Sequence, residues 1–159
     1  MRNKFAQMGT YVTGLLSGPA SGWLVMSMDD VAAKGINQSA FMKLDDRVLT
    51  PVAMKMQRTC FAGPALHGDA VFVGDDGQVV VIRPDRTTHD EFVTASVRNP
   101  QNTGHLRAGA RVGDDLVVVG MQRQVYRRAA SGGWQDWMAG LPAHAPAASV
   151  SGFEAVVGV

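Results

Sequence analysis

Short apolar runs bounded by glycine and aspartate recur along the chain. Residues 68–74 read Gly-Asp-Ala-Val-Phe-Val-Gly, and residues 78–83 read Gln-Val-Val-Val-Ile-Arg. Valine and aromatic side chains suit a pleated sheet, and the intervening Asp75-Asp76-Gly77 can adopt the positive backbone angles of a hairpin turn. The pattern therefore predicts strands that are joined by glycine-rich turns.

The segment at residues 68–74 has a counterpart at residues 113–120, which aligns with it if one residue is inserted. Their closing glycines, Gly74 and Gly120, lie 46 residues apart, and the glutamines four positions further on keep the same spacing. A period of about 45 residues is typical of propeller blades and similar arrays. Weaker copies are present at residues 21–26 and 151–158.

Helix signals are scarce in this sequence. Glutamate occurs twice, lysine occurs four times, and no long window has apolar residues at helical spacing. We expect at most one short helix, at Asp30–Ile36 or at Gly133–Leu141. Residues 142–149 are rich in proline and alanine and predict an ordered connector.

The length of 159 residues predicts a single β domain over residues 1–159, because domains usually have about 100 to 200 residues. Hydrophobic residues make up 46% of the chain and charged residues 18%, a composition that argues against intrinsic disorder. The expected fold class is all-β, built from antiparallel blade-like hairpin repeats of about 46 residues. The repeat units are expected at about residues 21–66, 67–112 and 113–149, with a partial unit at 150–159.

One stretch resembles a known kind of blade. Val125-Tyr126-Arg127-Arg128 and the following Ser131-Gly132-Gly133-Trp134-Gln135-Asp136-Trp137 resemble the end of a β-propeller blade of the kelch or Asp-box type. In such blades a valine-tyrosine-arginine strand runs through a glycine turn into a tryptophan strand. The resemblance covers roughly residues 60–141 and implies a propeller-like fold with three to four repeats.

The number of repeats is too small for one closed propeller. Propellers have about four to eight blades, whereas 159 residues hold about three and a half units of this period. Either several chains complete one ring, or partners cover the sheet edges, or the fold is a β-sandwich or small barrel. Unpaired edge strands are adhesive, so the propeller interpretation predicts association.

The charge balance favours no particular partner class. Fifteen Lys and Arg residues stand against fourteen Asp and Glu residues, which leaves a net charge of +1. A dedicated nucleic-acid-binding domain is usually strongly basic, so we expect no nucleic-acid partner. Residues 80–130 contain eight arginines against five acidic residues, and we expect these arginines to lie on a solvated strand surface.

The single cysteine and the N-terminal segment bear on localisation. Cys60 excludes an intramolecular disulfide, and its apolar neighbourhood predicts a buried, unreactive thiol. Gln7, Thr10 and Thr13 interrupt the apolar stretch that a signal peptide requires, and no apolar run is long enough to cross a bilayer. We therefore expect a soluble protein made in the cytoplasm, with no membrane partner.

No metal site or cofactor is expected. Asp-Asp pairs occur at positions 29–30, 45–46, 75–76 and 114–115, where they favour turns more than calcium binding. The histidines lack the close spacing of paired metal ligands and lie at His67, His89, His105 and His144.

We therefore predict a non-enzymatic structural or interaction scaffold made of propeller-like repeats. It is expected to assemble as a homo-oligomer or with other protein subunits in a larger complex, such as a virion or an appendage. The first alternative is a lectin-like module, in which aromatic faces stack on a glycan. Its predicted contacts are Trp134, Trp137, Tyr126 and Arg128.

The second alternative is a propeller-type glycoside hydrolase, although the resemblance by itself does not imply an enzyme. His89-Asp90-Glu91 could orient an acid-base histidine, but the chain has no Gly-x-Ser-x-Gly motif to supply an activated nucleophile. An exposed polar loop is the favoured explanation of these three residues. We therefore expect no catalytic residues.

Overall fold

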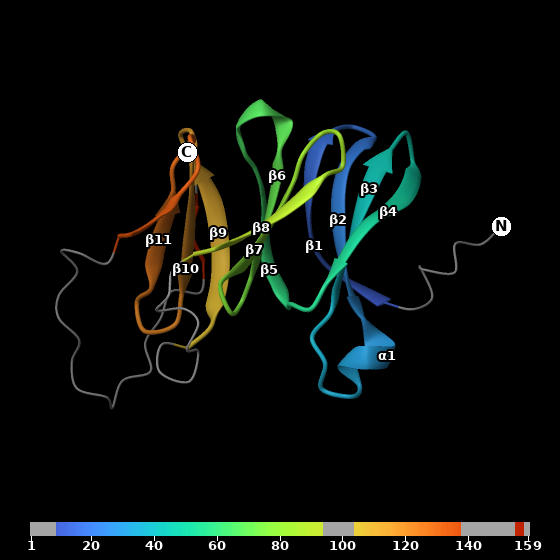
Figure 1. Ribbon diagram of the computed structural model, residues 1–159, viewed down its shortest axis with the longest axis horizontal. Coiled ribbons are helices and arrows are strands. Elements are labelled where there is room, and N and C mark those ends of the chain that lie inside the picture. Colours follow the sequence, from blue (N-terminus) through green and yellow to red (C-terminus); the bar gives the residue numbers. More distant parts are fainter. Residues whose placement is uncertain (1–8, 94–103, 138–154, 158–159) are drawn as a thin grey trace.

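The fold is all-β, as predicted. The computed structural model describes residues 9–93, 104–137 and 155–157. Within these ranges, twelve strands form three antiparallel sheets of four strands each, and each strand pairs with the strand next to it in sequence (Figure 1). We call them sheets 1, 2 and 3 in chain order.

Sheet 1 contains the strands of residues 9–55. These are β1 (Gly9–Gly18), β2 (Ser21–Met28), β3 (Ser39–Asp45) and β4 (Val48–Lys55). A single helical turn, α1 (Asp29–Ala32), lies between β2 and β3, which confirms the first of the two helix predictions. No helix in the described ranges is long and apolar enough to span a bilayer.

Sheet 2 contains the strands of residues 59–92. These are β5 (Thr59–Pro64), β6 (Ala70–Gly74), β7 (Gln78–Ile82) and β8 (Thr88–Phe92), with a short 3₁₀ turn, η2 (Leu66–Gly68), before β6. The predicted hairpin turn joins β6 to β7. There Gly77 has φ of +81° and its N–H donates to the Gly74 carbonyl at 3.0 Å.

Sheet 3 contains the strands of residues 106–136. These are β9 (Leu106–Val112), β10 (Asp115–Gly120), β11 (Val125–Arg128) and β12 (Trp134–Asp136). The helix predicted at Gly133–Leu141 is wrong over its first residues, because β12 pairs with β11 there, and its part beyond Trp137 lies outside the described residues.

The predicted turn role of the aspartate pairs is confirmed for three of the four pairs. The pair at 45–46 lies at the turn between β3 and β4, the pair at 75–76 between β6 and β7, and the pair at 114–115 between β9 and β10. The pair at 29–30 begins α1. Asp side chains favour such positions because they can hydrogen-bond to nearby backbone groups.

The predicted repeat units can be placed on these sheets. Their starts at residues 67 and 113 fall between the first and second strand of a sheet, and the start at residue 21 is the first residue of β2. The connector predicted at 142–149 lies outside the described residues. The same is true of the partial unit at 150–159, except for residues 155–157.

Sheets 1 and 2 pack through an aromatic core. Trp23 and Phe41 of sheet 1 meet Phe72 of sheet 2, with ring centroids 5.8 and 4.7 Å from Phe72. Val25 lies on the same face of sheet 1, while Val80 faces it from sheet 2. Alternation along β2 places Trp23 and Val25 on this face because successive strand residues point to opposite sides.

Sheets 2 and 3 pack through a core of smaller aliphatic side chains. Val71 and Val73 of β6 contact Leu116 and Val118 of β10, together with Tyr126 of β11. Strand β6 is therefore covered on both faces, which is why its sequence is apolar at every position rather than alternating.

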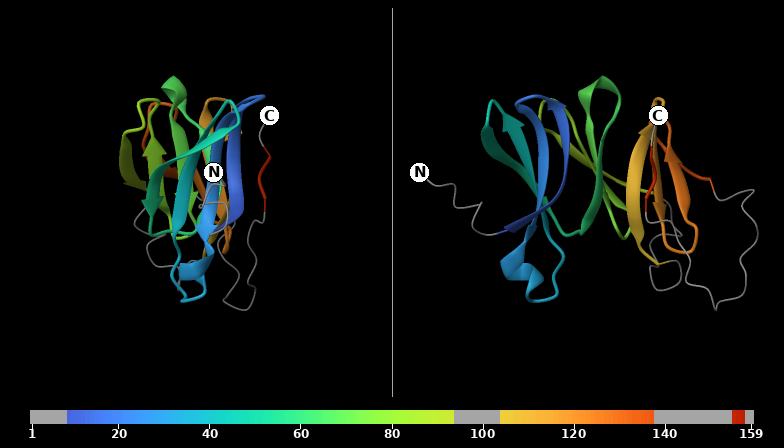
Figure 2. Two further views of the ribbon diagram at one scale, coloured as in Figure 1. Left: turned by 90° about the vertical axis from the view of Figure 1, so that its right-hand side faces the viewer. Right: turned by 180° about the vertical axis from the view of Figure 1, so that it is seen from behind.

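The first strands of the three sheets lie beside one another. β5 contacts both β1 and β9, so the sheets follow one another in the order 1, 2, 3, which is also clear from behind (Figure 2). At the β5–β9 contact, a Cβ atom added to Gly109 would lie 2.6 Å from the Phe61 ring. Glycine at this position lets the two strands approach each other closely.

Candidate functional site

The four residues predicted to bind a glycan do not share a surface. Tyr126 is fully buried between sheets 2 and 3, and its hydroxyl donates to Gln124 Oε1 at 3.1 Å. Arg128 is also buried, and Trp134 is partly buried. Trp137 has 47% of its surface exposed. These side chains therefore form no common stacking platform.

Arg128 and Trp134 both bind Glu91 of β8. Nε and Nη2 of Arg128 donate to the two Glu91 oxygens at 2.9 and 2.7 Å, and Trp134 Nε1 donates at 3.1 Å. His89 Nε2 lies 3.0 Å from Glu91 Oε1. We call these four residues the Glu91 cluster. It joins sheet 2 to sheet 3 across a separation of 37 residues between Glu91 and Arg128.

The Glu91 cluster stabilises the ionised carboxylate. Burial alone would raise the pKa of Glu91, but the hydrogen bonds from Arg128 and His89 and the positive charge of Arg128 lower that pKa to about 2. The bidentate pairing of Arg128 is the strongest geometry of this kind. The cluster therefore links sheets 2 and 3 through a bidentate salt bridge.

The residues considered for the hydrolase alternative, His89 and Asp90, lie on opposite faces of β8. His89 belongs to the Glu91 cluster on the side of sheet 3, whereas Asp90 pairs with Lys55 of sheet 1 at 2.8 Å. Alternation along the strand explains this separation. His89 and Asp90 therefore do not converge on one site.

The face of sheet 1 that points away from sheet 2 is apolar throughout. We call it the outer face of sheet 1. Paired residues of neighbouring strands lie on the same face, so the strand register defines three rows across the sheet. The rows are Tyr11-Met26-Ala40-Met54, Gly14-Leu24-Met42-Pro51 and Leu16-Gly22-Leu44-Leu49.

The outer face of sheet 1 has a buried centre and an exposed rim. Met26 and Met42 are almost fully buried in a cluster whose members all come from sheet 1 and α1. At the rim, Tyr11, Leu16 and Met54 are exposed, and Leu16 has 71% of its surface accessible. These three side chains lie at separate points around the apolar centre of the face, Tyr11 and Leu16 on β1 and Met54 on β4.

The face of sheet 3 that points away from sheet 2 is apolar near its first two strands. We call it the outer face of sheet 3. The register places Ala108 with Val119, and Ala110 with Val117, on this face. Towards the outer strands, Arg127 donates to Asp115 at 2.6 Å and its guanidinium lies 5.3 Å from the centroid of the Trp137 ring. Small apolar residues therefore lie beside a more polar margin.

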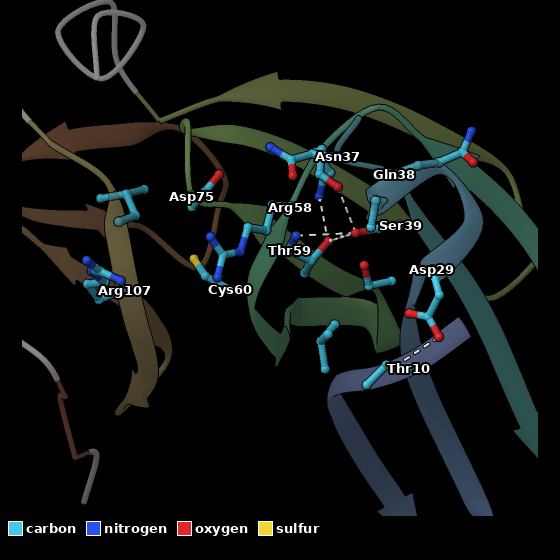
Figure 3. Close-up of a pocket in the computed structure, with 15 residues that line it drawn as sticks. Thr10, Asp29, Asn37, Gln38, Ser39, Arg58, Thr59, Cys60, Asp75 and Arg107 are labelled. Atoms are coloured by element: carbon cyan, nitrogen blue, oxygen red, sulfur yellow. Dashed lines mark hydrogen bonds between the residues drawn. The ribbon is translucent and has the colours of Figure 1, made fainter. Parts of the chain in front are cut away.

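A pocket of about 530 Å³ opens where the first strands of the three sheets begin. We call it the end pocket. Its walls come from Thr10 of β1, Thr59 and Cys60 of β5, and Arg107 of β9, and also from Asp75 after β6 (Figure 3). All three sheets therefore contribute to it.

The floor of the end pocket is a hydrogen-bonded group that links sheet 1 to sheet 2. Ser39 Oγ donates to the Gln57 carbonyl at 2.9 Å and accepts from Thr59 Oγ1 at 3.0 Å. Gln57 Nε2 donates to Thr59 Oγ1 at 3.0 Å. All three residues are buried, and Gln57 Oε1 is buried without a hydrogen-bond partner among the described residues.

Two arginines and an aspartate give the end pocket its charge. The Arg58 side chain extends towards the side of the pocket where Arg107 and Cys60 lie (Figure 3). Arg58 and Arg107 are exposed, and neither has a carboxylate within ion-pair distance among the described residues. Asp75 is largely buried, which raises its pKa, and its Oδ2 lies 3.4 Å from His105 Nδ1.

Cys60 and the acidic residues supply no obvious reactive group. Burial, with a smaller contribution from the Asp75 charge, raises the pKa of the Cys60 thiol to about 12, so it stays protonated at neutral pH, as predicted. Among the residues that the structure describes, no three His, Cys, Asp or Glu side chains come together as a metal site.

The sequence analysis missed the outer faces and the end pocket. The signal for the outer face of sheet 1 was the unbroken apolar run Trp23–Met26, because a strand covered on both faces has no polar alternation. The end pocket had no such signal, since its walls come from distant parts of the chain. Comparisons with protein-family models, curated protein sequences and solved structures found no match to this chain.

Proposed function

We propose that this protein is a non-enzymatic structural scaffold, built from propeller-like blades, that assembles through the outer faces of its first and last sheets. The observation that carries the proposal is the outer face of sheet 1. Its three rows contain no charged or hydrogen-bonding side chain except the hydroxyl of Tyr11. A face of this composition is typical of a sheet that packs against another sheet.

The arrangement of the strands supports the blade interpretation. Each sheet is a four-stranded antiparallel meander, and the first strands lie side by side, as the inner strands of propeller blades do. Val25, Val71 and Val117 occupy the second strands of the three sheets at intervals of 46 residues. The spacing inferred from two segments therefore also fits sheet 1.

The second strands support the assembly interpretation. β6 is apolar on both faces because it lies between sheets 1 and 3. β2 and β10 are apolar on both faces too, although each belongs to a sheet at one end of the row. Their second faces match the pattern of strands that are covered on both sides, which is what a further sheet from a partner would provide.

The test is the absolute mass in solution, measured by light scattering across a tenfold concentration range. We expect a stable mass above the 16.9 kDa of one chain. Leu16→Glu, which puts a charge on the rim of the outer face of sheet 1, should return the mass to that of one chain. The matched control is Val48→Glu, because Val48 is 62% exposed on the same sheet but pairs with Asp45, which lies off that face.

Two results would contradict the scaffold. One is a strictly monomeric wild type that also retains no partner protein, and the other is the same loss of mass in Leu16→Glu and Val48→Glu. Circular dichroism spectra must show that both variants keep the strand content of the wild type. Without this check, unfolding could be mistaken for a lost interface.

A second candidate function is the binding of a small anionic ligand in the end pocket. The observation that favours it is the pair Arg58 and Arg107, whose guanidinium groups line the pocket without carboxylate partners among the described residues. Guanidinium groups recognise carboxylates and phosphates through paired hydrogen bonds. These two arginines, above the Ser39–Thr59 floor, would donate the hydrogen bonds to the anion.

Titration calorimetry with inorganic phosphate and with citrate tests this second function. We expect heat of binding for one of the two ligands, and we expect it to be lost in the double variant Arg58→Gln, Arg107→Gln. The control is Arg83→Gln, because Arg83 is exposed and does not line the pocket. Equal binding by all three proteins, or no binding by the wild type, would contradict the assignment.

A further inference from the structure

We infer that the partner for the outer faces is a second copy of this chain, joined head to tail, so that two copies close a ring of six sheets. This inference rests on the proposed scaffold function and specifies its partner. In the ring, the outer face of sheet 3 of each copy packs on the outer face of sheet 1 of the other. Two identical contacts then cover both kinds of outer face, whose central side chains, such as Met42 and Val117, are already buried within the chain and whose exposed side chains, such as Leu16 and Trp137, lie at the rim.

Each sheet presents an equivalent face to the sheet that follows it. Val25 of sheet 1 faces sheet 2, and Val71 of sheet 2 faces sheet 3. Val117 comes 46 residues after Val71 and lies on the outer face of sheet 3, together with Ala110. The outer face of sheet 3 is therefore equivalent to the face of sheet 1 that sheet 2 covers and to the face of sheet 2 that sheet 3 covers.

The same relation holds in the opposite direction. Ala70 of sheet 2 faces sheet 1, and Leu116 of sheet 3 faces sheet 2. Leu24 precedes Ala70 by 46 residues and lies on the outer face of sheet 1. This outer face is therefore equivalent to two faces that are covered by a preceding sheet. Sheet 3 of a second copy would supply that preceding sheet and continue the internal packing.

The sizes of the side chains fit this pairing. Inside the chain, the large Phe61 of β5 packs on Gly109 of β9. Across the inferred contact, β1 offers the exposed Tyr11 and Leu16, and β9 offers the small Ala108 and Ala110. Large side chains on one first strand again meet small ones on the other, which allows dense packing between the sheets.

Ring closure sets the number of copies. Closed propellers have about four to eight sheets, and each chain supplies three. Six is the only multiple of three in this range, so the ring needs two copies. A head-to-tail contact that closes produces a finite oligomer, whereas one that does not close produces a filament. The expected mass is therefore twice the 16.9 kDa of one chain at every concentration where the ring is formed.

Two variants distinguish a head-to-tail ring from other contacts. Leu16→Glu charges the outer face of sheet 1, and Ala110→Glu charges the outer face of sheet 3. Each variant alone should have the mass of one chain, because every contact in the ring needs one face of each kind. Mixed in equal amounts, they should form a two-chain species held by one intact contact, with weaker affinity than the wild type.

The outcomes separate the inference from the proposed function. If Ala110→Glu alone stays a dimer while Leu16→Glu does not, sheet 1 packs on sheet 1, and the inference fails while the scaffold stands. The inference also fails, and the scaffold stands, if the wild type has the mass of three or more chains or if it is a monomer that binds only a different protein. A monomeric wild type without any partner contradicts both. Val48→Glu serves as the control, and it should remain a dimer with unchanged strand content.

Discussion

The two contacts between neighbouring sheets are built in different ways. Sheets 1 and 2 are joined by aromatic rings, with Phe72 between Trp23 and Phe41. Sheets 2 and 3 are joined by aliphatic side chains around Tyr126 and by the Glu91 cluster, in which a carboxylate binds Arg128. The aromatic core of the first contact depends on buried apolar area, which is insensitive to pH, and the Lys55–Asp90 pair beside it is more exposed. The second contact also depends on the charge of the less exposed Glu91 carboxylate.

The largest expected effect is at the aromatic contact. Phe72→Ala removes the ring that touches both Trp23 and Phe41 and leaves a cavity in the core. We expect the free energy of unfolding to fall by about 4 kcal/mol, measured by urea denaturation. Val48→Ala, at an exposed position, should change it by less than about 0.5 kcal/mol. A small loss for Phe72→Ala would mean that another contact holds sheets 1 and 2 together.

A smaller effect is expected at the ionic contact. Glu91→Gln keeps the shape of the side chain but leaves the buried Arg128 guanidinium without a carboxylate. We expect a loss of about 2 kcal/mol in the same urea measurement, because hydrogen bonds to charged groups are worth more than neutral ones.

The neighbouring residue of β8 provides the control for the ionic contact. Asp90→Asn breaks the more exposed pair with Lys55, on the side of sheet 1, and should cost less than about 1 kcal/mol. If Asp90→Asn cost as much as Glu91→Gln, the difference between the two faces of β8 would be contradicted.

The smallest effect is the pH dependence of the ionic contact. Because the pKa of Glu91 is lowered from 4.5 to about 2 in the folded protein, the stabilisation is complete above pH 4.5 and is lost as the pH falls towards 2. The difference in unfolding free energy between the wild type and Glu91→Gln should therefore shrink between pH 5 and about pH 2. The difference for Phe72→Ala should stay constant over the same range, and a parallel decrease would contradict the separation of the two contacts.

Local chemistry determined the strands and turns, and these were predictable. The turn at Asp75-Asp76-Gly77 and the short helix near Asp30 depend on residues adjacent in sequence. The same is true of the valine-rich strands on either side of that turn. Such elements are specified by backbone preferences and by the alternation of side chains, both of which can be read within a few residues.

The candidate sites were less predictable because alternation does not say which face meets which sheet. Tyr126 and Arg128 were expected at a surface, but both point towards sheet 2, where Arg128 meets Glu91. The adjacent His89 and Asp90 were considered together, yet His89 binds Glu91 of the same strand on one face of β8, and Asp90 binds Lys55 of sheet 1 on the other. A strand residue has two possible environments, and the choice between them depends on what packs on each face.

The all-β chain and its hairpin turns follow from residues that are close together along the chain, as does the 46-residue spacing of Gly74 and Gly120. The central place of sheet 2, the pairing of Glu91 with Arg128 and the apolar outer face of sheet 1 emerge only when distant segments pack. The two groups of features differ in the sequence separation of the residues that produce them. Turns and strand periodicity depend on neighbouring residues, whereas the burial of a face depends on segments tens of residues away that come together when the chain folds.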